Sequence, residues 1–166
     1  DLYKMSNGGI TLSGGEPLMQ AAFAIDLLKR IGVVGIHRAL ETSGFAEAKI
    51  FEEVICNTDF VYMDLKLADP KLHKKYTGVS NESILNNAEV LQNSKIPHVF
   101  RIPLIPGITD GKDNLIALAG IVKNSKVELL PYNRFAPAKY ESVGRKFPEY
   151  IEPVEHATVD ISMFKN

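Results

Sequence analysis

The stretch Gly8-Gly9-Ile10-Thr11-Leu12-Ser13-Gly14-Gly15-Glu16-Pro17-Leu18 predicts a strand that turns sharply into a helix. Ile10–Leu12 is a short apolar strand, and the glycine pair after it lacks Cβ atoms, so a ligand could approach the backbone closely. Pro17 suits the first position of a helix, where its missing N–H costs nothing. Ligands are commonly held at such turns in α/β folds, which makes Glu16 a candidate partner for an ammonium group.

Apolar and amphipathic segments alternate along the chain, and the strand ends recur every ~25–35 residues, the spacing of βα units. We expect parallel strands joined by right-handed crossovers. The prediction is an α/β fold, an incomplete (β/α) barrel formed by residues 1–166 as one domain, with a doubly wound sheet as the alternative. The expected strands are Ile10–Leu12, Ile36–Leu40, Phe60–Leu65, Val99–Leu104 and Val127–Leu130, and the expected helices are Pro17–Ile31, Glu47–Cys56, Glu82–Asn93 and Asp113–Asn124.

The composition is that of an ordinary globular protein: 166 residues with a formal net charge of −1. This balance argues against strong electrostatic attraction to nucleic acid or to an anionic membrane. No apolar run approaches the length of a membrane span. We therefore expect no nucleic-acid or membrane partner, and a cytoplasmic location.

Cys56 is the only cysteine, so the chain can form neither an internal disulfide nor a site with several thiolates. Its position at the end of a predicted helix favours a small apolar packing residue over a ligand or a nucleophile.

Polar residues follow several predicted strands, where the carboxyl ends of parallel strands meet at one edge. Glu16, Glu41-Thr42-Ser43, Asp64-Leu65-Lys66 and Tyr132-Asn133-Arg134 occupy such positions. One such group alone is more often a helix cap, but four coincident groups favour a binding site.

Asp64 and Lys66 are two residues apart on a predicted strand and should face the same side. Together they could bind a hydroxylated, zwitterionic ligand, with Asp64 accepting hydrogen bonds and Lys66 donating them. An exposed ion pair between the two is the plainer interpretation. A desolvated lysine at a strand end could also form a Schiff base.

Arg101 lies inside an apolar strand and needs an anionic partner there, because burying an unpaired guanidinium is very unfavourable. Glu41, Asp64 and a ligand carboxylate are the candidates. A structural ion pair and a ligand contact remain equally open. The irregular segment Pro131–Pro153 is interpreted either as a lid or binding element, or as a segment packed across the end of the barrel.

The glycine-rich turn resembles the amine-binding motif of radical S-adenosylmethionine (SAM) enzymes, and within them the branch that activates glycyl radical enzymes such as pyruvate formate-lyase. The resemblance extends over nearly the whole chain. It is carried by Gly14-Gly15-Glu16, Glu41-Thr42-Ser43-Gly44-Phe45, Asp64-Leu65-Lys66, His73 with Thr77-Gly78, Arg101 to Gly107, Leu129-Leu130-Pro131-Tyr132-Asn133 and Lys139-Tyr140.

The resemblance implies a set of SAM-binding residues. Gly15 and Glu16 would receive the methionine amine, Asp64, Leu65 and Lys66 would lie along the ligand, and Asn133 would lie near the adenosine. The residues assigned to the cofactor are Gly14, Gly15, Glu16, Glu41, Thr42, Asp64, Leu65, Lys66, Arg101 and Asn133. Glu41 and Asp64 are also the place for a cation beside the SAM carboxylate, and no side chain is assigned as a general acid or base.

The implied reaction is reductive cleavage of SAM by a [4Fe–4S] cluster, followed by hydrogen-atom removal from a glycine in the glycine loop of a partner enzyme. A flavodoxin or ferredoxin would supply the electron. The family's Cys-x-x-x-Cys-x-x-Cys motif is absent, so the cluster ligands are expected outside this chain. We therefore expect a fragment, truncated at the N-terminus and within the barrel at the C-terminus, that is inactive alone although the whole protein is an oxidoreductase.

Two other functions are kept as alternatives: a Schiff-base aldolase that uses Lys66, and a non-catalytic module that docks a partner protein through Pro131–Pro153.

Overall fold

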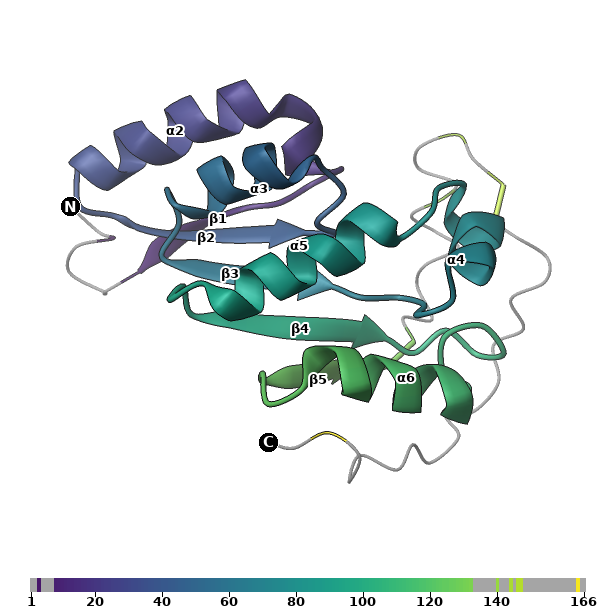
Figure 1. Ribbon diagram of the computed structural model, residues 1–166. Coiled ribbons are helices and arrows are strands. Elements are labelled where there is room, and N and C mark those ends of the chain that lie inside the picture. The colour runs from purple at the N-terminus through teal and green to yellow at the C-terminus, as the bar shows by residue number, and fades with distance from the viewer. Residues whose placement is uncertain are drawn as a thin grey trace.

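The computed structural model describes residues 8–132 and the positions 3, 140, 144, 146, 147 and 164. At its centre is a parallel sheet of five strands that lie side by side in sequence order (Figure 1). The strands are β1 (Gly9–Leu12), β2 (His37–Thr42), β3 (Phe60–Asp64), β4 (His98–Pro103) and β5 (Val127–Leu130). Each begins and ends within two residues of its predicted bounds.

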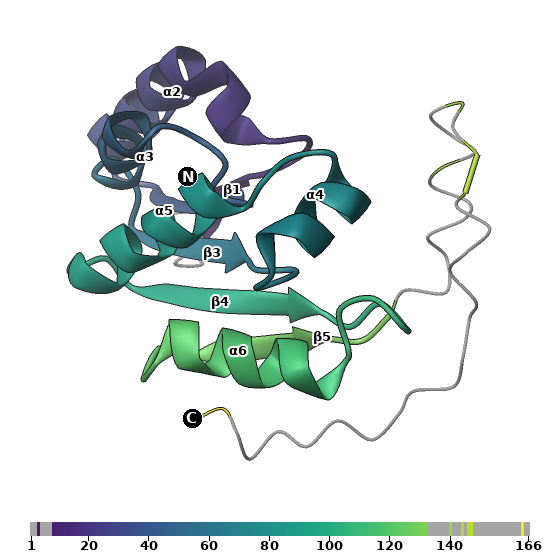
Figure 2. The same cartoon turned by 45° about the vertical axis from the view of Figure 1, so that its right-hand side comes forward.

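The connections between strands are helical: η1 (Pro17–Gln20), α2 (Ala21–Val33), α3 (Ala48–Ile55), α4 (Pro70–Thr77), α5 (Glu82–Asn93) and α6 (Lys112–Val122). Figures 1 and 2 show α2, α3, α5 and α6 as one layer over one face of the sheet, and neighbouring helices of this layer contact one another. Sequential strand order with helices on one face is the geometry of a partial barrel, which confirms the prediction. The doubly wound alternative is wrong, because it requires the strand order to reverse at a switch point.

Helix α4 was not predicted, and its sequence explains why. Its N-cap is Asp69, whose carboxylate accepts a hydrogen bond from the N–H of Leu72 at 2.8 Å, and its C-cap is Gly78, which has φ +87°. Between them His73 is the single buried residue, so there is no apolar stripe to detect. Figure 2 shows α4 at the carboxyl ends of the strands, apart from the helix layer.

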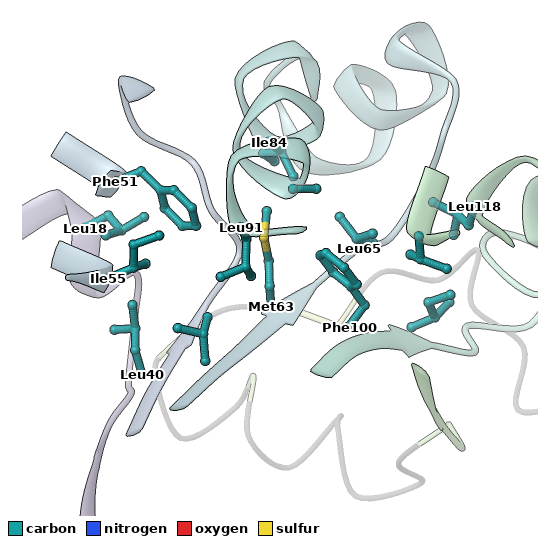
Figure 3. Packing of buried hydrophobic residues seen from close by; sticks show 14 of the residues in the cluster. Leu18, Leu40, Phe51, Ile55, Met63, Leu65, Ile84, Leu91, Phe100 and Leu118 are labelled. Atoms are coloured by element: carbon teal, nitrogen blue, oxygen red, sulfur yellow. The ribbon is translucent and has the colours of Figure 1, made fainter. Parts of the chain in front are cut away.

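The hydrophobic core lies between the sheet and the helix layer (Figure 3). In β3 and the residue after it, Val61, Met63 and Leu65 are buried toward the helices, so Tyr62 and Asp64 face the opposite side. Burial of each large apolar side chain contributes about 1.5–3 kcal/mol. This alternation decides which residues of β3 are available to a ligand. Helix residues of the core include Leu28, Phe51, Ile55, Ile84, Leu91 and Leu118.

The expectation for Cys56 was wrong: the residue caps the end of α3 and is exposed. Its backbone N–H bonds Glu52 and Val54, but its side chain points away from the core that Val54 and Ile55 enter. Among the helices in the described ranges, none combines the length and apolar content needed to cross a membrane.

Candidate functional site

Polar groups from the carboxyl ends of β1, β2 and β3 line an open pocket of about 290 Å³. Parallel strands bring these three ends to the same edge of the sheet, although they are far apart in sequence. The lining residues are Ser13, Gly14, Gly15, Glu16, Glu41, Thr42, Ser43, Asp64 and Lys66.

The turn after β1 forms one wall of the pocket from bare backbone. Gly14 has φ +119°, a region that side chains disfavour, and an added Cβ at Gly14 or Gly15 would meet no atom of the described residues within 4 Å, its chain neighbours aside. The two glycines are therefore not required by packing within the protein, and they leave room beside the pocket. Glu16 follows in an extended conformation and caps η1, accepting a hydrogen bond from Leu18 N–H at 3.1 Å, while Pro17 takes the first helical position.

The Glu16 carboxylate is held by four neutral donors. Besides Leu18 N–H, the Thr42 hydroxyl donates to Oε1 at 2.5 Å and the Ser43 N–H donates to Oε2 at 2.8 Å. The Ser43 hydroxyl also donates to Oε2. These bonds orient the carboxylate without cancelling its charge, so the side chain still presents a negative charge to the pocket.

A row of charges continues from Glu16 along the edge of the sheet. Asp64 and Arg101 are register partners on β3 and β4, and the Arg101 side chain bonds Asp64 Oδ1 through Nε (3.1 Å) and Nη2 (3.0 Å). Arg101 Nη2 also donates to Glu41 Oε1, and the guanidinium lies 5.2 Å from the centre of the Tyr62 ring. Lys66 Nζ lies 3.8 Å from Asp64 Oδ2.

The ion pairs shift the pKa values of Glu41 and Arg101. The Arg101 hydrogen bond holds the pKa of Glu41 below its usual value, although partial burial opposes the shift and a Ser13 hydrogen bond assists it. Burial would lower the pKa of Arg101, but the carboxylates of Glu41 and Asp64 outweigh it and raise the pKa. Both groups are therefore charged at neutral pH.

Among the described residues, three carboxylates (Glu16, Glu41, Asp64) face two cations (Lys66, Arg101), which leaves one excess negative charge at the pocket. The excess sits at Glu16, because the other two carboxylates already have cationic partners. A ligand that carries an ammonium group and a small net positive charge would complement this arrangement. Lys66, one-third exposed, can meet a ligand carboxylate at the other side.

Comparison with known proteins identifies the architecture. Residues 2–119 match the family model of the radical SAM superfamily. The chain belongs to this superfamily. A solved domain of pyruvate-formate lyase-activating enzyme from Bacteroides vulgatus has a TM-score of 0.70 and 37% sequence identity, with 76% of this chain and 82% of that one covered.

Relatives of this radical SAM chain are activating enzymes. It is 38% identical to the 4-hydroxyphenylacetate decarboxylase activating enzyme of Clostridioides difficile, over 86% of this chain and 46% of that protein. It is 37% identical to the isethionate sulfite-lyase activating enzyme of Desulfovibrio desulfuricans, over 88% of this chain and 48% of the relative. The chain spans about half the length of the curated relatives it matches.

Radical SAM chemistry implies two groups, SAM and an iron–sulfur cluster. The residues of this chain suit the binding of SAM but not the ligation of a cluster. SAM carries an ammonium, a carboxylate and a sulfonium, and the pocket offers an uncompensated Glu16 and an accessible Lys66. A cluster needs several thiolates, whereas Cys56 is the only cysteine of the sequence. Among the described residues no group of three or more His, Cys, Asp or Glu side chains could hold a metal.

Most of the predicted site residues meet in the pocket: Gly14, Gly15, Glu16, Glu41, Thr42, Asp64 and Lys66. Arg101 lies beside them. Its guanidinium forms ion pairs with Glu41 and Asp64, two of the anionic partners that the sequence suggested. The side chain of Leu65 is instead buried in the core near Phe100 (Figure 3). Asn133 lies outside the described residues, as does most of Pro131–Pro153.

Sequence reasoning missed Ser13 as a member of the pocket. Ser43 was expected at the site with Glu41 and Thr42, among the polar residues that follow the strands, but was not assigned to the cofactor. The signal that could have found Ser13 is its place in the turn after a strand, where hydroxyl groups commonly bond a neighbouring carboxylate. Lys66, paired with Asp64 and partly exposed, is not the desolvated lysine that Schiff-base chemistry requires.

Proposed function

We propose that this chain is the SAM-binding part of an enzyme that activates a glycyl radical enzyme. The observation that carries the proposal is the Glu16 carboxylate, oriented by four neutral donors and facing the pocket that Asp64 and Lys66 also line. The printed functions of its relatives, activators of 4-hydroxyphenylacetate decarboxylase and isethionate sulfite-lyase, support the choice of reaction.

In this proposal the ammonium group of SAM binds at Glu16 and the backbone of Gly15. The SAM carboxylate binds Lys66, whose ammonium is held toward the pocket by Asp64. Glu41 and Thr42 keep the surrounding charges and donors in place, because Glu41 binds Arg101 and Thr42 binds Glu16. Of the remaining predicted contacts, Leu65 could meet the ligand only through its backbone, and Asn133 is assigned to the adenosine end.

Bound SAM supplies, after one-electron reduction, the 5′-deoxyadenosyl group that takes a hydrogen atom from a glycine Cα of the partner. The residues of this chain bind and orient SAM, and the cluster ligands belong to a part of the protein outside it. The partner is proposed to be the glycine loop of a glycyl radical enzyme, with a flavodoxin or ferredoxin as electron donor and the cytoplasm as the location.

The test is SAM binding by equilibrium dialysis to the full-length protein and to two single variants. Lys66→Met removes the carboxylate partner from a partly exposed position, and Lys71→Met removes an exposed lysine of α4 outside the pocket as the control. A charge-assisted hydrogen bond contributes about 1.5–3 kcal/mol, so Lys66→Met should weaken binding at least tenfold. SAM binding that is absent, or equal in both variants, would overturn the proposal.

A further inference from the structure

Three asparagine side chains from the helix layer bind the backbone of the loops that carry the pocket residues. Asn87 of α5 is fully buried, and its Nδ2 donates to the carbonyl oxygens of Gly44 (2.8 Å) and Ala46 (2.9 Å). This segment directly follows Thr42 and Ser43, which hold the Glu16 carboxylate. The amide of Asn87 thus fixes the loop after β2 from the helix side.

The loop after β3 is held in the same way by Asn81 and Asn114. Asn81 Nδ2 donates to Leu67 O at 2.7 Å and to Ala68 O at 3.0 Å. Asn114 of α6 accepts from Ala68 N–H at 2.9 Å and donates to Lys66 O at 3.0 Å.

Asn114 also joins two loops, because its Nδ2 donates to Thr109 O at 2.8 Å in the loop after β4. The Thr109 hydroxyl in turn donates to Pro103 O at 2.5 Å and accepts from Ile105 N–H at 2.6 Å. The loops after β2, β3 and β4 are therefore all tied, directly or through one residue, to α5 and α6.

Two of these asparagines, Asn81 and Asn87, leave part of their hydrogen-bonding capacity unused among the described residues. Asn81 stands at the N-cap of α5, where asparagine usually accepts from the helix N–H groups, yet its side chain makes no capping bond. The Oδ1 atoms of Asn81 and Asn87 are buried and have no hydrogen-bond partner in the part of the chain that the structure describes. Buried polar atoms are normally paired, so these positions are not explained by helix stability alone.

We propose that Asn81, Asn87 and Asn114 are positioning residues that hold the pocket loops in their ligand-ready geometry. The proposal rests on the assignment of the pocket to SAM. Asn87 acts on Glu16 through Thr42 and Ser43. Asn114 acts on Lys66 by donating a hydrogen bond to the backbone carbonyl oxygen of Lys66. The protein thereby presents a preformed pocket instead of ordering it at the moment of binding.

The chain offers a matched control on the same helix. Gln92 of α5 also donates through its amide to two carbonyl oxygens, those of Ala88 and Ile121, both at 3.2 Å. It lies toward the amino ends of the strands, away from the pocket, and it is not among the pocket residues. Asn87→Ala and Gln92→Ala each remove an amide that bonds two carbonyl groups.

Hydrogen exchange of the full-length protein gives the first readout. The N–H groups of Ser43, Gly44 and Ala46 bond Glu16, Thr42 and Gly44. We expect Asn87→Ala to speed exchange of these amides at least tenfold, while Gln92→Ala leaves them unchanged. Equal exchange in the two variants would overturn the proposal.

The second readout is the dissociation constant for SAM, expected to rise at least tenfold in Asn87→Ala and less than twofold in Gln92→Ala. An unchanged constant in Asn87→Ala would overturn the proposal. If the wild-type protein does not bind SAM, the proposed function fails, while the exchange result still decides whether the loop is held. If Asn87→Ala does not fold, Asn114→Ala at its half-buried position takes its place, read at the Ala68 amide and by SAM binding.

Discussion

Asp64 and Arg101 stand opposite each other in the β3–β4 register, and their side chains are joined by two contacts of 3.1 and 3.0 Å. The same guanidinium reaches Glu41 on β2, so one arginine crosslinks three adjacent strands at the pocket edge. Arg101, a single charged residue within an apolar stretch of the sequence, is thus part of an ion-pair network that it shares with Glu41 and Asp64. The arrangement orders the pocket wall before any ligand arrives.

Replacing Arg101 should destabilise the fold, because Arg101→Met leaves the partly buried Glu41 without its cationic partner and leaves Asp64 with Lys66 alone. We expect a loss of about 1.5–3 kcal/mol in the free energy of unfolding, measured by urea denaturation with an unchanged m-value. Arg30→Met is the control, since Arg30 and Asp26 form an exposed pair on α2. Such i,i+4 pairs contribute about 0.3–0.5 kcal/mol. Equal losses in the two variants would contradict the network.

Gly44 should not tolerate a side chain. It has φ +74°, and an added Cβ would collide with the Met63 side chain in the core. Gly44→Ala should therefore cost about 1–3 kcal/mol of stability, measured by thermal and urea unfolding. Gly120→Ala, at an exposed position in the last turn of α6 where an added Cβ meets no described atom, should instead gain about 0.5–1 kcal/mol. A neutral Gly44→Ala would show that the loop after β2 is not constrained in this way.

Acid should weaken the protein through Asp59. Hydrogen bonds from Arg38 lower the pKa of Asp59 from 3.8 to about 2, with the N–H and Nε bonded to Oδ2 and Nη2 to Oδ1. A carboxyl group with a lowered pKa stabilises the fold above its unfolded pKa. That stabilisation should be lost as the pH falls from about 4 to about 2.

The measurement is the free energy of unfolding against pH for the wild type and Asp59→Asn. The variant should be less stable at pH 7 and should lose less stability than the wild type between pH 4 and pH 2. Asp26→Asn, whose carboxylate forms an exposed pair with Arg30 of the same helix, serves as the control and should retain the wild-type acid dependence. Parallel curves for wild type and Asp59→Asn would refute the assignment.

Cys56 should behave as a surface thiol. Because it is exposed at the end of α3, a disulfide reagent should label it stoichiometrically in the native protein. Cys56→Ser should change stability by no more than about 0.5 kcal/mol. Labelling that occurs only after unfolding would show that the side chain is buried.

The sheet and much of the pocket follow from local rules. Each of the first four strands is short and apolar and precedes an amphipathic helix in the chain, so the sequence predicts a parallel α/β fold without further information. The glycine pair and Pro17 predict the turn at Glu16, because glycine and proline select their own backbone geometry. Helix α4 was not predicted because the residues between its two caps show no apolar periodicity.

Leu65 shows where a motif and a physical rule disagree. The family resemblance assigns Asp64, Leu65 and Lys66 together to the ligand. The two-residue period of the strand, however, separates Leu65 from its neighbours and sends its side chain into the core. Cys56 was expected to pack as a small apolar residue but is exposed, because a residue at the end of a helix can face either the solvent or the core.

The sequence alone determined the order of the strands and of the helices other than α4, the Glu16 turn and the shared face of Asp64 and Lys66, because these depend on backbone preferences and side-chain alternation within short segments. Tertiary structure decided the partners of Arg101, the four donors on Glu16 and the asparagine bonds to the pocket loops. Those contacts join segments far apart in the chain. They exist only once strand register and helix packing have brought the donors and acceptors within hydrogen-bond distance.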